Sequence, residues 1–253
     1  MNKILLRLTL KWTACLFLLP LIIIQGAWIK RTIKKLVIAS PPNEGVFPPN
    51  ITDEGNGFLI AGVGDSVIAG IGVNEMRESL TARLAEKIAV QSPLPVRWLA
   101  YGCDGDRARD LLGKIPNYPR QNADLVVISI GVNDVMGMTS VTRWQFEITA
   151  IIGALREAFR APIVFVGLPP MGRFSALPQP LRYAMGIRAE LLDLMLRNAA
   201  TVIHDVYWID SSSFFDASHL AADGFHPNES ACDLIAGQIM STTEIETLLK
   251  HET

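Results

Sequence analysis

From residue 57 onward, short apolar runs alternate with longer stretches that have the 3.6-residue period of helices. Strands that are separated by helices pair in parallel, because each helix crosses over the face of the sheet. The pattern therefore predicts an α/β fold, a three-layer sandwich around a flavodoxin-like five-stranded parallel sheet. The expected strands are residues 58–63, 96–101, 125–130, 163–168 and 201–208, and the expected helices are 78–91, 107–114, 144–160, 181–200 and 229–249, the last broken near residue 241.

The first 36 residues differ in charge from the rest of the chain. They hold seven of the 23 Lys and Arg residues and none of the 25 Asp and Glu residues. The remainder therefore carries 16 basic and 25 acidic side chains, a formal balance of −9. An acidic globular part argues against a nucleic-acid partner, because contacts to phosphates need clustered cations.

An apolar run of 18 residues without a charge spans residues 12–29, close to the roughly 20 residues that a membrane helix needs. Trp12 and Trp28 mark its ends, and Lys11 and Lys30 flank it. A retained single-pass anchor is favoured over a cleaved signal peptide, because the run is long and no Ala-x-Ala site follows it. The cations on the two sides balance, which leaves the orientation open; we expect the globular part on the extracytoplasmic side.

These patterns divide the chain into three segments. Residues 1–36 form the membrane anchor, or an uncleaved signal, with basic flanks, and residues 37–56 form a proline-rich tether. Residues 57–253 form the globular domain. The three cysteines lack the spacing of a metal site or a disulfide framework.

Four short motifs lie where expected strands end or where the last helix begins. The carboxyl ends of parallel strands meet at one edge of the sheet, where open α/β sheets bind their ligands. We therefore expect the motifs to come together in the fold. In chain order they are Gly64-Asp65-Ser66, the turn at Gly102, Gly131-Val132-Asn133-Asp134 and Asp223-Gly224-Phe225-His226.

The residue types in these motifs suit acyl transfer. A serine such as Ser66 becomes a nucleophile when a base takes its proton and donors hold the developing oxyanion. Asp223, three residues before His226 on one turn, can orient that imidazole while its other ring nitrogen faces outward. Gly102 lets a substrate oxygen approach its backbone N–H closely, and Asn133 offers a neutral amide donor.

The four blocks, in this order, resemble the SGNH (GDSL-like) hydrolase family, serine esterases and lipases, over residues 58–240. The resemblance implies an esterase, lipase or acylhydrolase with Ser66 as nucleophile, His226 as base and Asp223 as its orienting acid. It also implies an oxyanion hole formed by the backbone N–H groups of Ser66 and Gly102 and by the amide of Asn133. The expected partners are a small-molecule or lipid ester and, through the N-terminal helix, a membrane; no cofactor or metal is expected.

Several alternatives stay open on the sequence alone. The same residues suit an acyltransferase or deacetylase acting on a glycan or lipid, and a non-catalytic, membrane-tethered binding module is a third possibility. Asp216-Ala-Ser-His219 is a second Asp-x-x-His; we prefer 223–226 because Gly-Phe precedes His226 and a proline follows it. The proline-rich stretch 168–182 is interpreted either as a lid or wall of an acyl pocket or as a loop packed on its own domain.

Overall fold

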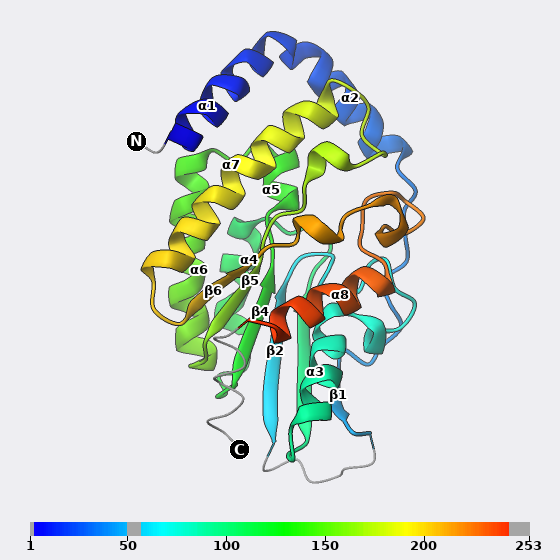
Figure 1. Cartoon of the computed structure of the whole chain (residues 1–253), viewed down its shortest axis with the longest axis vertical. Coiled ribbons are helices and arrows are strands. Elements are labelled where there is room, and N and C mark those ends of the chain that lie inside the picture. Colours follow the sequence, from blue (N-terminus) through cyan, green and yellow to red (C-terminus); the bar gives the residue numbers. More distant parts are fainter. Residues whose placement is uncertain (1–2, 50–56, 243–253) are drawn as a thin grey trace.

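The computed structural model of the chain describes residues 3–49 and 57–242. Its centre is a six-stranded sheet in the order β1-β3-β2-β4-β5-β6 (Figure 1). The strands are β1 Glu44–Phe47, β2 Phe58–Gly64, β3 Val96–Gly102, β4 Leu125–Ser129, β5 Ile163–Val166 and β6 Val206–Ile209.

Strands β2 to β6 all run parallel, and their order along the sheet is that of a flavodoxin-like fold. The predicted fold class is therefore confirmed. Strand β2 lies between β3 and β4, and all of its residues are buried. Its last residue, Gly64, pairs with Gly102 of β3 and with Ser129 of β4. Three of the predicted turns thus start from adjacent strands.

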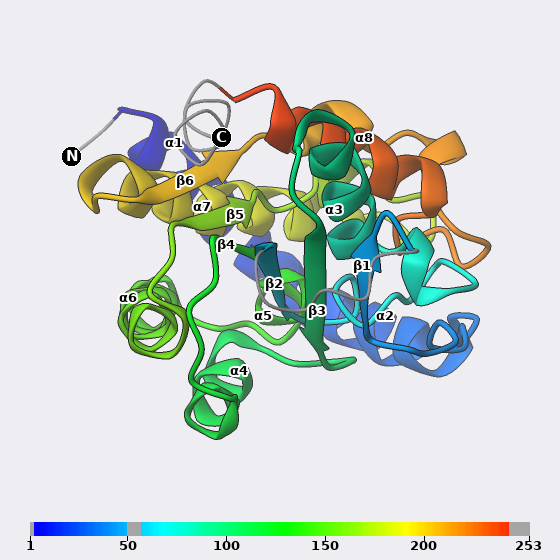
Figure 2. The same ribbon diagram turned by 90° about the horizontal axis from the view of Figure 1, so that it is seen from below.

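Helices cover both faces of the sheet and complete the three layers (Figure 2). Residues that alternate along each strand divide between two apolar clusters, as expected for strands that are buried on both faces. Helices α3 Leu80–Gln91 and α8 Glu229–Met240 cover one face. On the other face lie α4 Ala108–Lys114, α5 Val132–Met136, α6 Val141–Phe159 and α7 Leu181–Val202.

Three elements differ from the sequence-based expectation. The expected tether contains a strand, since Glu44–Phe47 pairs antiparallel with β3 at the sheet edge. The strand expected at 201–208 was placed too early: α7 continues to Val202, and β6 begins only at Val206, after a turn at Asp205 with φ 53°. Helix α5 was not predicted, because five residues are too few to show a helical period. Residues 50–56 of the tether and the end of the last predicted helix lie outside the described residues.

The N-terminal segment is helical from Lys3 to Thr32, as α1 Lys3–Cys15 and α2 Leu19–Thr32 joined by a 3₁₀ turn. This helix is long and apolar enough to be a membrane anchor or a signal sequence. It lies along α7 at one end of the molecule (Figure 1). Its buried residues recur every seventh position, as a helix packed on another helix requires: Leu8, Cys15, Ile22 and Ile29.

Candidate active site

Ser66 lies just beyond the carboxyl end of β2, where the chain turns sharply. Gly64 has φ 150°, and a Cβ atom on it would lie 1.9 Å from the carbonyl oxygen of Ser129. Only glycine fits such a close approach. The next backbone N–H, that of Asp65, donates to the same Ser129 oxygen at 3.0 Å. The turn therefore leaves the sheet at a fixed angle and directs Ser66 towards the edge where the loops gather.

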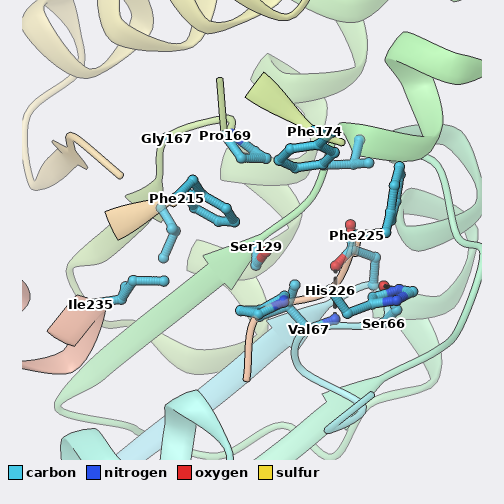
Figure 3. Close-up of a pocket in the computed structure, with 14 residues that line it drawn as sticks. Ser66, Val67, Ser129, Gly167, Pro169, Phe174, Phe215, Phe225, His226 and Ile235 are labelled. Carbon is cyan, nitrogen blue, oxygen red and sulfur yellow. Dashed lines mark hydrogen bonds between the residues drawn. The ribbon is translucent and has the colours of Figure 1, made fainter. Parts of the chain in front are cut away.

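A continuous chain of hydrogen bonds joins Ser66 to His226 and Asp223. The Nε2 atom of His226 lies 3.0 Å from Oγ of Ser66, and Nδ1 of the same ring lies 2.6 Å from Oδ2 of Asp223. The other carboxylate oxygen of Asp223 accepts from the backbone N–H groups of Phe225 and His226, at 2.9 and 3.0 Å. Figure 3 shows Ser66 and His226 together at one side of a pocket. The structure thus brings these three predicted residues together.

The charge of Asp223 suits its contact with the imidazole. Burial alone raises the pKa of this carboxyl, but the hydrogen bonds from the His226 ring and from the two backbone N–H groups outweigh it. Its pKa is therefore below the ordinary value. An ionised Asp223 favours a proton on Nδ1 of His226, which leaves the lone pair of Nε2 facing Ser66. This is the arrangement that a general base requires.

Asp65, between Gly64 and Ser66, has the opposite electrostatic character. Complete burial raises the pKa of its carboxyl to about 7, against the opposing effects of a hydrogen bond from the Val67 N–H and of nearby His226. Its Oδ1 atom accepts from the Val67 N–H at 3.2 Å, a contact that closes the turn. A second acid whose pKa is shifted therefore borders the serine.

The two other predicted oxyanion donors come from the turns after β3 and β4. A Cβ atom on Gly102 would lie 2.1 Å from the backbone nitrogen of Ala69, so a glycine is needed for the turn after Ser66 to pack here. The side-chain nitrogen of Asn133 donates to the carbonyl oxygen of Asp106 at 3.0 Å. An amide nitrogen carries two protons, so this bond orients Asn133 and leaves one proton for another acceptor.

Buried polar contacts around α5 fix the Asn133 turn. Asp134 accepts from the Ala108 N–H at 2.9 Å and from the Thr139 hydroxyl at 2.8 Å. Arg188 of α7 is buried and donates to the carbonyl oxygens of Val135 and Thr139, at 3.2 and 2.6 Å. The sequence analysis missed Arg188. A signal was present, because residue 188 falls on the buried face of α7 set by Leu181, Met185 and Leu192.

Asp106 is a second residue whose role the sequence did not reveal. Its carboxylate is buried and bonds Nζ of Lys114 at 2.6 and 2.7 Å, while its carbonyl holds Asn133. This ion pair raises the pKa of the Lys114 ammonium above its ordinary value. Since the partners lie eight residues apart on a turn and a helix, no local spacing rule would have predicted the pair.

A small apolar pocket adjoins Ser66 and His226 (Figure 3). Its volume is about 40 Å³. Its walls come from the turns after β2, β4 and β5, from α8 and from the chain that leads to His226, and include Val67, Val132, Phe174, Phe215, Phe225 and Ile235. The phenylalanines are close to one another, with the ring centres of Phe174 and Phe225 5.1 Å apart.

The stretch 168–182 forms part of this pocket wall through Pro169 and Phe174. It is also packed on its own domain, because Phe174 and Leu177 are buried. A Cβ atom on Gly186 of α7 would lie 2.8 Å from the Cα atom of Gly172, so the stretch and the helix are in backbone contact. Both features that the sequence analysis considered for this loop, wall and packed loop, are present.

A family model described as "GDSL-like Lipase/Acylhydrolase family" matches residues 63–234. The chain belongs to this family. The resemblance seen in the sequence is thereby confirmed, and the matched range includes all four sequence motifs. Membership supports hydrolysis of esters as the activity of this GDSL-like protein. A search of curated protein sequences found no match.

Solved structures with the same fold include several esterases. A family 3 carbohydrate esterase from Clostridium thermocellum is 20% identical, with 78% of this chain and 100% of that chain covered and a TM-score of 0.59. A lipolytic protein of the G-D-S-L family from Veillonella parvula is 18% identical, with coverage of 74% and 98% and a TM-score of 0.56. An acetylxylan esterase from Geobacillus stearothermophilus is 16% identical, with coverage of 74% and 94% and a TM-score of 0.51.

Proposed function

We propose that this GDSL-like protein is a serine esterase in which Ser66, His226 and Asp223 form the catalytic triad. The observation that supports this most strongly is the unbroken sequence of bonds from the Ser66 hydroxyl through both ring nitrogens of His226 to Asp223. A serine without such a base is a weak nucleophile. The family match supports the same reaction class independently of the geometry.

In the proposed reaction, Ser66 Oγ attacks the ester carbonyl while Nε2 of His226 takes the hydroxyl proton. Asp223 stabilises the imidazolium that results. His226 then gives its proton to the leaving alkoxide, and an acyl-enzyme ester on Ser66 remains. A water molecule, deprotonated by the same imidazole, attacks this ester and releases the carboxylic acid, so that Ser66 recovers its proton.

We assign the oxyanion hole to the backbone N–H groups of Ser66 and Gly102 and to the free proton of the Asn133 amide. These donors act where negative charge develops, and each contributes about 3 kcal/mol to lowering the barrier. The bond from Asn133 to the Asp106 carbonyl supports this assignment, since it holds the amide in one orientation before a substrate arrives. Preorganised donors avoid the cost of reorientation during the reaction.

We assign the pocket beside Ser66 to the acyl group of the substrate. Its volume of about 40 Å³ is a few times the roughly 10–15 Å³ that a cavity needs to hold one water molecule. Pockets for drug-sized ligands measure about 300 Å³ or more. The apolar walls suit a methyl or ethyl group, and the size favours short acyl esters over long-chain lipids.

We also propose that the helix Lys3–Thr32 is retained as the membrane anchor, with the catalytic domain on the extracytoplasmic side. Because one side of the helix packs on α7, it holds the domain against the membrane in this arrangement and does not cross the bilayer apart from the domain. The helix contains the charge-free run 12–29. It also exposes large apolar side chains on the side away from α7, including Phe17, Ile24 and Trp28. Such a surface is stable in lipid and costly in water.

Replacement of Ser66 by alanine tests the proposed function. With p-nitrophenyl acetate and butyrate, we expect hydrolysis to fall by at least about 10³-fold and labelling by a fluorophosphonate probe to disappear. Ser92→Ala, which removes an exposed serine hydroxyl, should keep both. Hydrolysis retained in Ser66→Ala would exclude Ser66 as the nucleophile.

Two measurements on the wild type test the alternative functions. Product analysis with a competing alcohol distinguishes hydrolysis from acyl transfer. A wild-type chain that does not react with the fluorophosphonate probe would favour a binding module.

A further inference from the structure

Gln25 is unusual within the N-terminal helix, because it is the one side-chain amide in the apolar run 12–29. A polar side chain in a membrane helix is costly unless it finds hydrogen-bond partners. In the structure Gln25 finds them in the catalytic domain. Its Nε2 atom donates to the carbonyl oxygen of Gln179 at 2.7 Å, and its Oε1 atom accepts from the backbone N–H of Leu181 at 3.0 Å.

These two bonds lie at the start of α7, whose first helical residue is Leu181. The first N–H groups of a helix have no partner within the helix, and a side chain before the helix usually binds one of them. The residue at that position here is Pro180, which has no side-chain acceptor. The side chain of Gln179 binds the Tyr183 N–H at 3.2 Å, and Gln25 supplies the partner of the Leu181 N–H from another helix.

The capped end of α7 also supports the wall of the acyl pocket. Phe174 lines the pocket, and its backbone carbonyl oxygen accepts a hydrogen bond from the Leu177 N–H at 3.1 Å. The carbonyl oxygen of Leu177 in turn accepts from Nε of Arg182, in the first turn of α7, at 2.7 Å. The position of Phe174 thus depends, through one short turn, on the place where α7 begins.

We propose that Gln25 is a positioning residue that ties the N-terminal helix to the Phe174 wall and thereby limits the length of the acyl group that the esterase accepts. The inference rests on the proposed function, because it assigns the pocket to the acyl group. Gln25 acts through the first turn of α7 and does not touch the substrate. The N-terminal helix is accordingly part of the substrate-selecting structure as well as a membrane segment.

The test compares Gln25→Leu with the wild type, both as the full chain in detergent micelles. Leucine keeps the apolar packing of α2 and removes both hydrogen bonds. We expect the ratio of kcat/KM for p-nitrophenyl butyrate to that for acetate to rise by roughly fivefold, which corresponds to the loss of one helix cap. We also expect the Leu181 amide hydrogen to exchange faster. Thr13→Val is the matched control, since its hydroxyl bonds the Thr9 carbonyl within the same helix; both readouts should stay at the wild-type level.

An unchanged butyrate-to-acetate ratio in Gln25→Leu would overturn the proposal, as would a Leu181 amide that exchanges at the wild-type rate. If Gln25→Leu does not fold, Gln25→Glu serves instead, since it keeps an acceptor for Leu181 and loses the donor to Gln179. A smaller shift in the same direction is then expected, and no shift overturns the proposal. Failure of the proposed function itself is recognised separately, because the wild type would then hydrolyse no ester or Ser66→Ala would retain activity.

Discussion

The turns 216–219 and 223–226 share the pattern Asp-x-x-His but differ in their surroundings. The side chain of Asp216 is 66% exposed, and its Oδ1 atom is bonded by the backbone N–H and the hydroxyl of Ser218. The side chain of Asp223 is 2% exposed. One of its oxygens accepts from backbone N–H groups, and the other is bonded to the His226 ring. The difference shows that burial and local competition decide what such a pair can do.

The middle residues of the two turns explain the difference. Ser218 places a hydroxyl beside Asp216, and the ring nitrogen of His219 lies 3.3 Å from an oxygen that is already bonded. In the other turn, Gly224 has φ 66°, which lets the chain curl so that Asp223 accepts two backbone N–H groups. Phe225 then packs edge-on against His226, with ring centres 5.5 Å apart.

Removal of each imidazole should give the largest contrast between the two turns. We expect His226→Ala to lower kcat by about 10²- to 10⁴-fold with p-nitrophenyl acetate, because it removes the proposed general base. His219→Ala should stay within about twofold of the wild type, since its ring does not bond Ser66. Circular dichroism on both variants checks that the fold is kept. If the two losses were equal or reversed, the base would have to be reassigned.

Replacement of each aspartate by asparagine should give an intermediate contrast. Asp223→Asn should lower kcat by roughly tenfold to 10³-fold, because an amide no longer stabilises the imidazolium. Asp216→Asn should have little effect on kcat.

The same two variants also test how Asp223 contributes to stability. The pKa of Asp223 is lower in the folded chain than its ordinary value, so its stabilising effect is present above about pH 4 and is lost as the pH falls further.

Urea unfolding at pH 7 and pH 3 measures that effect. Asp223→Asn should destabilise the domain more at pH 7 than at pH 3, because the stabilisation by the wild-type carboxylate is lost as the pH falls towards its lowered pKa. The exposed Asp216 also has a lowered pKa, mainly through the Ser218 hydroxyl, but solvent screening should leave Asp216→Asn close to the wild type at both pH values. A pH-independent loss in Asp223→Asn would point to packing instead of charge.

The smallest contrast concerns the middle residues of the turns. Gly224→Ala forces a Cβ atom into a left-handed conformation and should cost about 1 kcal/mol of unfolding free energy. A moderate fall in kcat should accompany it, as the turn that orients His226 is strained. Ser218→Ala, which frees Asp216 on the surface, should change neither quantity. Thermal unfolding and ester hydrolysis, measured for both variants, test this difference. A Gly224→Ala variant with wild-type stability and wild-type kcat would contradict the prediction.

The sequence predicted the sheet and the assembly of Ser66, His226 and Asp223 in one place because local patterns encode both. Runs of apolar residues identify buried strands, and the topology of parallel strands brings their ends to one edge. The oxyanion roles and the triad roles remain proposals. The contacts that hold the site are less visible in the sequence, because they join residues far apart along the chain. Arg188 and Gln25 bond distant backbone groups, and the backbone carbonyl of Asp106 accepts from the Asn133 side chain.

The elements that were misplaced have different physical causes. Thr201 and Val202 are β-branched and suited the expected strand, yet they extend α7 at its exposed end, where packing does not decide. Strand β1 forms because it pairs with the edge strand β3. Four residues are too few for their own periodicity to predict such a strand. A tertiary contact thus determined the place of β1, whereas the extension of α7 occurs where such contacts are few.

The proposed nucleophile and its proposed base are separated by 160 positions along the chain. A ribosome that has completed Ser66 must therefore still synthesise nearly all of the sandwich before an imidazole can reach that hydroxyl. Under the proposed function, we therefore expect prematurely terminated polypeptides to lack esterase activity. The proposed site can be complete only late in biosynthesis, once the turn that carries Asp223 and His226 has been made.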